Sequence, residues 1–290
     1  MRIVRWAEAG SQEARFGLWI DDMIADAGTA AECGVPEGAG IEALLGRGML
    51  ALEQLESRAV TRRRIPRSGV RLLPPLARPT KIFCLGLNYL DHAREQGKEP
   101  PPSPVVFMKP PSSITGPHDD IVLPAFCRHV DHEIELAFVI GKRAKNVPVA
   151  RARSHIAGYL VLNDVTDRKI QKEEVQNSRA KGFDTFCPLG PALVTANEVS
   201  DPGNLLLRLS VDGAVRQEAR TSNMIQSVEK ILEFLSRGLT LEPGDVVATG
   251  TPAGVGVFRD PKVFLEDGQV VRAEIEGIGV IENRVRREAA

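Results

Sequence analysis

The chain has 290 residues, of which 43% are apolar and 26% charged, and its formal net charge is −1. These values are ordinary for a folded globular protein with one large domain, or with a main domain and a smaller companion. They give no sign of a nucleic-acid partner or an anionic membrane partner, and no uncharged apolar run approaches membrane-spanning length.

The cysteines and the N-terminus narrow the cellular context. The four cysteines have no paired spacing, so they fit reduced thiols better than a disulfide framework or a zinc site; they are Cys33, Cys84, Cys127 and Cys187. The first residues lack the apolar core of a signal peptide. We therefore predict a cytoplasmic protein without a nucleic-acid or membrane partner.

The first segment has the pattern of a small β-rich unit. Apolar runs at residues 3–6, 16–20 and 23–25 predict three strands separated by polar turns. Helical spacing follows over residues 41–55, interrupted by two glycines. Residues 58–79 are charged and contain four prolines, which is typical of a linker. We predict a small N-terminal domain over 1–75 and a main domain over 76–290.

The main domain opens with a buried strand at residues 81–87, followed by a short predicted helix that contains His92 and Glu95. Residues three apart on a helix face the same side. A carboxylate beside an imidazole raises its basicity and fixes its tautomer, so the pair suits a general base. The alternative is an ordinary surface pair. The proline-rich loop at 99–104 is a weak lid candidate.

Residues 131–141 form the stretch around which the chain is organised. The run is apolar and partly β-branched from Ile134 and stops at a glycine, which predicts a strand. Strand side chains alternate, so Glu133 and Glu135 project to one side while Ile134 and Leu136 point into a core. The alternative is that the two carboxylates belong to a solvated face of the strand.

A third carboxylate, Asp164, closes the next apolar strand at 158–165. Its ordinary explanation is an N-cap for the helix predicted to follow. Three carboxylates, with no CxxC motif and no histidine pair at helical spacing, instead favour an oxygen-ligand site. Such a site suits Mg²⁺ or Mn²⁺, with Ca²⁺ as an alternative occupant, and not Zn²⁺. Three protein ligands would leave coordination positions for water or substrate.

Further candidates follow along the chain. Arg168 and Gln171 would share one face of the helix after Asp164. Lys181 lies in a turn-rich, apolar stretch where a lysine is expected to line a cavity. Residues 249–256 are glycine-rich without the Gly-Lys-Ser/Thr of a phosphate loop, so Thr251 and nearby amides either approach a ligand or form a plain turn.

From about residue 81 to residue 285 the chain resembles the fumarylacetoacetate hydrolase family. Each matching motif is weak alone, but five in the same order are specific. They are GLNY with His92, the DHEIE strand at 131–135, NDVT at 163–166, KGFDTFCPLGP at 181–191 and TGTPAGVG at 249–256. Gly182 and His132 depart from the commoner Ser and Tyr of the family, which affects the expected pocket shape rather than the chemistry.

The resemblance implies an α+β fold, with a mixed β-sheet roll or sandwich, a few flanking helices and a small N-terminal domain. It implies metal ligation by Glu133, Glu135 and Asp164, and a His92–Glu95 dyad that activates water when a lid closes. The residues implied to hold a 2-oxo carboxylate or steady its enolate are Arg168, Gln171, Lys181 and Thr251. It also implies a homodimer.

The resulting hypothesis is a metal-dependent hydrolase that cleaves a C–C bond in an acylpyruvate-like or diketo acid, with Lys181 assisting the metal at the enolate. The alternative in the same site is an oxaloacetate-type decarboxylase, or a hydratase, isomerase or lyase on a related 2-oxo acid. A different class of function is an interaction protein with a structural cation in a filled coordination shell. Lysine or arginine salt bridges filling the space among the three carboxylates would count against the metal hypothesis.

Overall fold

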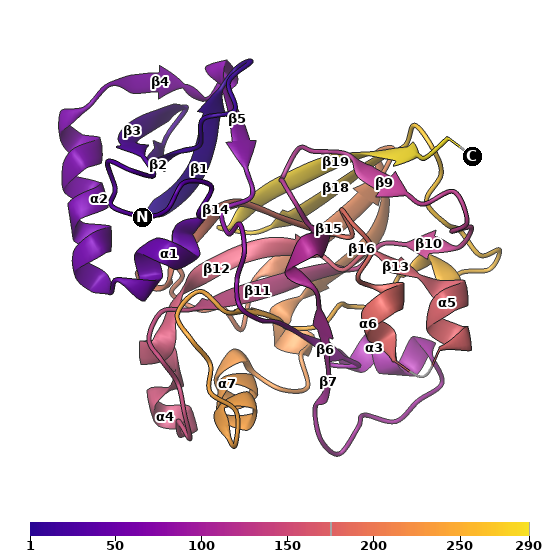
Figure 1. The fold of residues 1–290 in the computed structure, drawn as a ribbon. Helices are drawn as coiled ribbons and strands as arrows, with labels where there is room; N and C mark the ends of the chain where they lie inside the picture. Colours follow the sequence, from indigo (N-terminus) through magenta and orange to yellow (C-terminus); the bar gives the residue numbers. More distant parts are fainter. Residues whose placement is uncertain (175, 290) are drawn as a thin grey trace.

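The computed structural model describes residues 1–174 and 176–289. Its largest sheet has twelve strands, and Figure 1 shows this sheet running from the N-terminal segment into the centre of the molecule. The strands, in spatial order, are β4 (Arg64–Pro66), β3 (Met23–Thr29), β2 (Arg15–Ile20), β1 (Arg2–Glu8), β14 (Cys187–Thr195), β12 (Ile156–Asn163), β11 (Ile134–Ile140), β17 (Val246–Ala248), β6 (Ile82–Gly86) and β7 (Val105–Lys109), with β5 (Val70–Leu73) beside β1 and β8 (Ile114–Thr115) beside β14.

A five-stranded sheet packs against the central strands of the large one, so that β11 contacts β15 and β12 contacts β18. Its order is β16 (Ala214–Arg220), β15 (Leu206–Val211), β18 (Val270–Ile275), β19 (Gly279–Arg287) and β9 (Ile121–Leu123), and a small sheet pairs β10 (Val130–Asp131) with β13 (Thr166–Asp167). The helices are α1 (Ile41–Gly46), α2 (Met49–Thr61), α3 (Leu90–Glu95), α4 (Val149–Ala152), α5 (Arg168–Glu173), α6 (Asn177–Ala180) and α7 (Val228–Ser236). This is the predicted α+β architecture.

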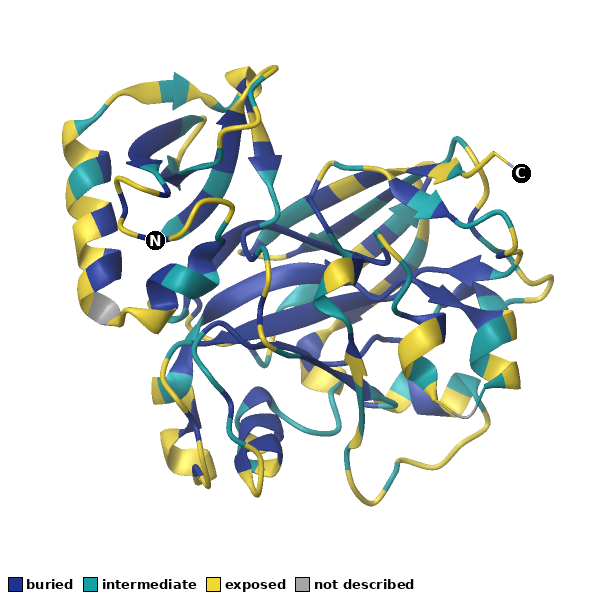
Figure 2. Cartoon of the chain, viewed as in Figure 1, coloured by how far each residue is buried: buried dark blue, intermediate teal, exposed yellow. Residues whose placement is uncertain are grey.

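The two central strands are buried on both faces, as the dark ribbon of β11 and β12 in Figure 2 shows. On one face of β11, Ile134, Leu136 and Phe138 belong to the core shared with the five-stranded sheet. On the other face, Ala137 and Val139 pack in a second core with α1 and α2. Because side chains alternate along a strand, that second face is also the one toward which Glu135 points.

The predicted linker at residues 58–79 was wrong in part. The segment contains the end of α2 and two strands, β4 and β5, which pair with β3 and β1. Pro66 is compatible with β4 because this strand lies at the edge of the sheet, where one side of the backbone needs no partner. Proline content alone therefore did not separate a linker from an edge strand.

The N-terminal segment continues the main sheet rather than standing apart from it. Antiparallel pairing joins β1 to β14, with Arg2 opposite Val194 and Ile3 opposite Leu193. The boundary at residue 75 therefore stays a prediction about independent folding. Within residues 1–174 and 176–289, no helix combines the length and the apolar character needed to cross a bilayer.

Candidate active site

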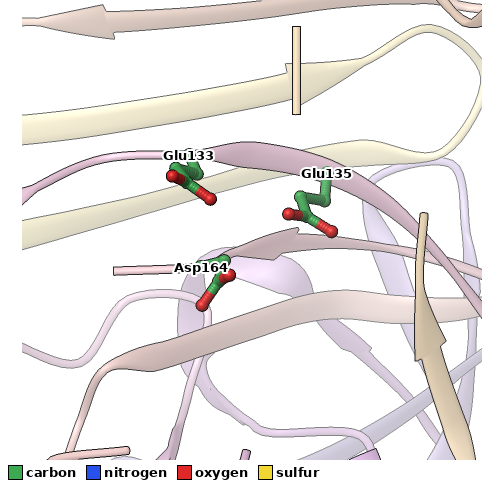
Figure 3. Close-up of side chains that lie close together, drawn as sticks. All are labelled: Glu133, Glu135 and Asp164. Atoms are coloured by element: carbon green, nitrogen blue, oxygen red, sulfur yellow. The ribbon is translucent and has the colours of Figure 1, made fainter. Parts of the chain in front are cut away.

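Three carboxylates meet where β11 and β12 run side by side (Figure 3). The register sets Ile134 opposite Asn163, and the amide of Asp164 donates to the carbonyl of Glu133 over 2.8 Å. Glu133 and Glu135 flank one β11 residue, and Asp164 directly follows β12. One carboxylate oxygen from each residue lies within 4.8 Å of the others. The pairing of two neighbouring strands thus brings the three predicted ligands together.

The ordinary explanations for these carboxylates do not hold. Glu133, Glu135 and Asp164 are 6%, 1% and 0% exposed, so they do not belong to a solvated strand face. Helix α5 is capped by Asp167, whose side chain accepts from the amide of Ile170 over 2.9 Å, and not by Asp164. Burial without a capping role leaves the acidic cluster in need of another source of stabilisation.

Part of that stabilisation comes from two buried lysines. The ammonium of Lys181 lies 2.9 Å from Glu133 Oε2 and 2.6 Å from Asp164 Oδ2, and the ammonium of Lys109 lies 2.6 Å from Asp164 Oδ1. The prediction of open space among the carboxylates was therefore wrong on the side of Asp164. The physical reason is that buried carboxylates require nearby positive charge. This arrangement is of the kind that counts against the metal hypothesis.

Glu135 is the exception within the cluster. Its Oε2 accepts from the amide of Gly250 over 2.8 Å, and among the described residues it has no lysine or arginine partner within 4 Å. Burial, followed by the charges of Asp164 and Glu133, raises its pKa well above the ordinary value. For Glu133 burial acts in the same direction, but the charges of Lys181 and Arg168 outweigh it and lower the pKa.

The charges of the cluster allow a test of whether the residues suit a metal. Two lysines against three carboxylates leave one negative charge, since Arg168 is shared with a further acid, Asp131. A divalent cation beside Glu135 would offset this negative charge and leave one positive charge for an anionic ligand, and carboxylate oxygens are the donors that Mg²⁺ and Mn²⁺ prefer. The residues therefore fit such an ion, provided that the Lys181 ammonium shifts within its hydrogen-bond network.

The predicted dyad lies on α3. His92 Nδ1 is 2.6 Å from Glu95 Oε1, and Glu95 Oε2 accepts from the amide of Gly254 over 2.9 Å. Gly254 has φ +106°, and a Cβ atom there would lie 2.2 Å from the carbonyl oxygen of Arg216. Only glycine permits this close approach. The carboxylate therefore has two fixed contacts, and it orients the imidazole through Nδ1.

Arg168 links the acidic cluster to Asp131 and to helix α5. Its Nε donates to Asp131 Oδ2 over 2.8 Å, and its Nη1 donates to Gln171 Oε1 over 3.0 Å. Its Nη2 lies 2.7 Å from Glu133 Oε1, an ion pair whose N–H direction does not make a hydrogen bond. Arg168 and Gln171 thus share one face of α5, with the guanidinium held in place by Asp131.

A cavity of about 880 Å³ joins these groups. Its lining includes most of the predicted functional side chains, namely His92, Glu133, Arg168, Gln171, Lys181 and Thr251. The Thr251 hydroxyl accepts from Gln217 Nε2 over 2.7 Å. Glu135 and Asp164 do not line the described cavity themselves, whereas Lys181, which bonds Asp164, does. The cavity can hold a small organic acid against both the dyad and the acidic cluster.

Several residues of the site escaped the sequence analysis. Lys109 ends β7 and is 1% exposed; the only local signal was a lysine between a strand and two prolines. Asp131 and Gln217 fix Arg168 and Thr251 from other elements. His132 directly precedes Glu133, and its Nδ1 lies 3.2 Å from Gln217 Oε1. Long-range contacts of this kind leave no periodic pattern in the sequence.

Comparison with known proteins gives concordant matches. Residues 81–286 match the family model described as fumarylacetoacetate (FAA) hydrolase C-terminal. A mitochondrial oxaloacetate tautomerase of Bos taurus is 48% identical over 223 residues, 76% of this chain and 71% of that protein. The 5-carboxymethyl-2-hydroxymuconate delta-isomerase structure from Mycobacterium smegmatis has a TM-score of 0.78 at 38% identity, covering both chains fully. Maleylpyruvate hydrolase from Sphingobium sp. SYK-6, in complex with manganese(II) and pyruvate, has a TM-score of 0.83 at 32% identity and also covers both chains fully.

Proposed function

Because this chain belongs to the fumarylacetoacetate hydrolase family of enzymes, we propose that it is a divalent-metal-dependent enzyme of small 2-oxo acids. We propose further that its reaction moves a proton on the carbon next to the keto group, as in the keto–enol tautomerisation of oxaloacetate. The observation that carries the proposal is that His92 lines the same cavity as Glu133, Arg168 and Lys181. The tautomerase and isomerase names of similar proteins support the same choice of reaction.

In this proposal Glu133, Glu135 and Asp164 hold Mg²⁺ or Mn²⁺, which as a Lewis acid would stabilise negative charge on a keto oxygen. Arg168, with Gln171 beside it, offers a fixed guanidinium for the carboxylate of the substrate. Lys181 remains an ammonium: burial opposes its charge, but Asp164 and Glu133 outweigh burial and raise its pKa. Its three N–H groups already face Glu133, Asp164 and Thr166, so it contributes charge rather than a transferable proton.

The proton is carried by His92. Glu95 accepts the Nδ1 proton, so the lone pair on Nε2 is the proton acceptor. Nε2 takes a proton from the carbon next to the keto group, and the electrons of that C–H bond form a carbon–carbon double bond as charge moves to the keto oxygen. Nε2 then returns the same proton to that oxygen and gives the enol. Atoms balance without a further reactant.

Hydrolysis of a C–C bond is the second candidate, favoured by a cavity far larger than a four-carbon acid and by the likeness to a maleylpyruvate hydrolase. Here Nε2 would deprotonate a water that attacks the distal carbonyl of an acylpyruvate. Decarboxylation of oxaloacetate needs no water nucleophile. His92→Ala separates these cases, because tautomerisation and hydrolysis require the base whereas decarboxylation persists without it.

The test is a substrate panel of oxaloacetate and acylpyruvates, with Mn²⁺ or Mg²⁺ and with EDTA. The same proton transfer runs in both directions, so with oxaloacetate added as its enol we expect a metal-dependent loss of enol absorbance toward the keto–enol equilibrium. The rate of this loss should fall at least about 100-fold in His92→Ala. Glu95→Gln should retain the fold and lose most of the rate. Full activity in EDTA would contradict the metal role, and activity on acylpyruvates alone would make the enzyme a hydrolase. A homodimer and a cytoplasmic location stay predictions, the first testable by sedimentation.

A further inference from the structure

The proton-accepting atom of His92 has a partner that the proposed reaction does not use. Gln96 Nε2 lies 2.8 Å from His92 Nε2, and the ammonium of Lys98 donates to Gln96 Oε1 over 3.0 Å. The ammonium marks the oxygen end of the amide, so the end facing the imidazole is the NH₂ group. Gln96 therefore donates to the lone pair of Nε2.

The turn after α3 creates this arrangement. The amide of Lys98 donates to the carbonyl of Ala93, and the amide of Gly97 donates to that of Arg94. Gly97 has φ +65°, and these two hydrogen bonds form a Schellman ending of the helix. This ending folds Lys98 back toward the last turn of α3. Gln96 and Lys98 both line the cavity, and Lys98 is exposed.

A neutral imidazole has one nitrogen lone pair that is not part of the aromatic π system and can accept a proton or a hydrogen bond. In this structure the amide of Gln96 occupies it, so the same lone pair cannot accept a proton from a substrate at the same time. Proton transfer therefore requires Gln96 to turn away from Nε2. The Lys98 ammonium holds the oxygen end of the Gln96 amide. Lys98 is also exposed in the cavity, so an anion that enters the cavity can contact it.

The outer part of the cavity favours anions. Besides Lys98, it carries Lys172, Arg259 and Lys262, with Asp260 as the acidic neighbour among the lining residues. Arg259 donates to the backbone carbonyls of Gly254 and Arg216, which are neutral acceptors, so these hydrogen bonds do not neutralise its positive charge. An acid with a second carboxylate at the end distant from Arg168 would bring that carboxylate toward these cations.

We propose that Gln96 is a positioning residue that keeps the lone pair of His92 Nε2 occupied until a second carboxylate of the substrate draws Lys98 away. Gln96 is then released, and Nε2 becomes free to take the proton. The inference rests on the proposed function and adds a specificity device to it. Dianionic 2-oxo acids trigger the release, whereas monoanionic acids enter the same cavity with the base still engaged.

The test compares oxaloacetate with its 4-methyl ester, which has the same reacting carbons and lacks the second charge. In the wild-type protein we expect kcat to be higher for oxaloacetate by about two- to tenfold, the worth of one hydrogen bond. In Gln96→Leu the ester should gain kcat until the two values agree, while KM still favours oxaloacetate. In Lys98→Met the contact that fixes Gln96 is lost, so both substrates should show the high kcat of oxaloacetate.

Lys169→Met is the matched control, since Lys169 is exposed on α5, pairs with Glu173 and does not line the described cavity. It should keep the wild-type difference in kcat. Lys98 is exposed, so its variant keeps the experiment informative if Gln96→Leu unfolds. An unchanged kcat ratio in Gln96→Leu or Lys98→Met overturns the inference. An inactive wild-type protein overturns the proposed function instead.

Discussion

Two groups of acidic and basic side chains in this chain differ in how their charges balance. The buried cluster comprises Glu133, Glu135, Asp164, Lys109 and Lys181, and the N-terminal cluster comprises Asp26, Glu32, Arg15, Arg62 and Arg63. In the N-terminal cluster each of these two carboxylates has an arginine within 2.8 Å, so neither is left without a basic partner. In the buried cluster carboxylates outnumber lysines.

The surroundings of the two clusters turn this difference into opposite pKa shifts. Glu32 is 41% exposed along its side chain, and its hydrogen bonds to Arg62 and to the amide of Thr29 lower its pKa to about 2. Glu135 is fully enclosed beside two other carboxylates, and its pKa is raised. A cluster of charged side chains is therefore a candidate functional site when the cluster is buried and its charges do not balance. A cluster of exposed ion pairs is not.

The largest expected effect comes from breaking the buried cluster at Asp164, which faces both lysines. Asp164→Asn leaves Lys109 and Lys181 buried beside a neutral amide, and we expect a loss of about 3–5 kcal/mol in the free energy of unfolding. Urea unfolding measures this value. The double variant Lys109→Met with Asp164→Leu, which removes a pair rather than a partner, should recover part of the loss. A deficit below about 1 kcal/mol in Asp164→Asn would contradict the buried pairing.

Glu135→Gln should separate metal binding from stability. The dissociation constant for Mn²⁺ should rise at least about 100-fold, as measured by titration calorimetry, because a ligand charge is lost. The free energy of unfolding should stay at or above the wild-type value at neutral pH. Because the pKa of Glu135 is raised in the folded state, the wild-type protein loses stability as pH rises above 4.5, the ordinary pKa of a glutamate. The difference in free energy of unfolding between Glu135→Gln and the wild type should therefore grow with pH. If Glu135→Gln were destabilised and still bound Mn²⁺ normally, Glu135 would be a structural residue and not a metal ligand.

A smaller effect is expected where Arg168 joins the cluster to the substrate side of the cavity. Arg168→Lys keeps the charge but cannot reach Asp131, Glu133 and Gln171 together. We expect KM for oxaloacetate to rise about tenfold, with a smaller change in kcat, in steady-state assays with Mn²⁺. Lys172→Arg, which also changes a cavity-lining cation while keeping charge, is the control and should shift KM less.

The smallest effect belongs to the N-terminal cluster. Glu32→Gln should leave the melting temperature nearly unchanged at pH 7, because exposed ion pairs contribute little. Because the pKa of Glu32 is lowered in the folded state, its ion pair stabilises the wild-type protein above pH 4.5, the ordinary pKa of a glutamate. This small stabilisation relative to Glu32→Gln should disappear as pH falls toward about 2. Thermal scans across this range measure it. A loss comparable with that of Asp164→Asn would remove the contrast between the clusters.

The sequence supplied the local part of the site. Two-residue alternation placed Glu133 and Glu135 on one side of β11, and the end of the neighbouring apolar strand placed Asp164. Helical spacing paired His92 with Glu95 and Arg168 with Gln171. Both depend on residues close in the chain, where geometry follows directly from secondary structure.

The rest depended on contacts that no spacing encodes. Lys109 reaches Asp164 across 55 positions, and its ammonium is enclosed by Asp164 and the backbone carbonyl of Lys181, which lies far along the chain from β7. Without that contact, the open arrangement of carboxylates was the natural expectation. The strands β4 and β5 were missed for a similar reason, because proline and charge at a sheet edge resemble a linker until the partner strand is known.

The amide of Gly254 has a consequence beyond holding Glu95. It ties α3 to the loop that rests on the β15–β16 hairpin, across 159 positions of the chain. The orientation of the imidazole thus depends on a backbone amide that does not line the cavity and takes no part in the proposed reaction. Any side chain introduced at position 254 would press on Arg216, lever the loop outward and misdirect a histidine that it never touches.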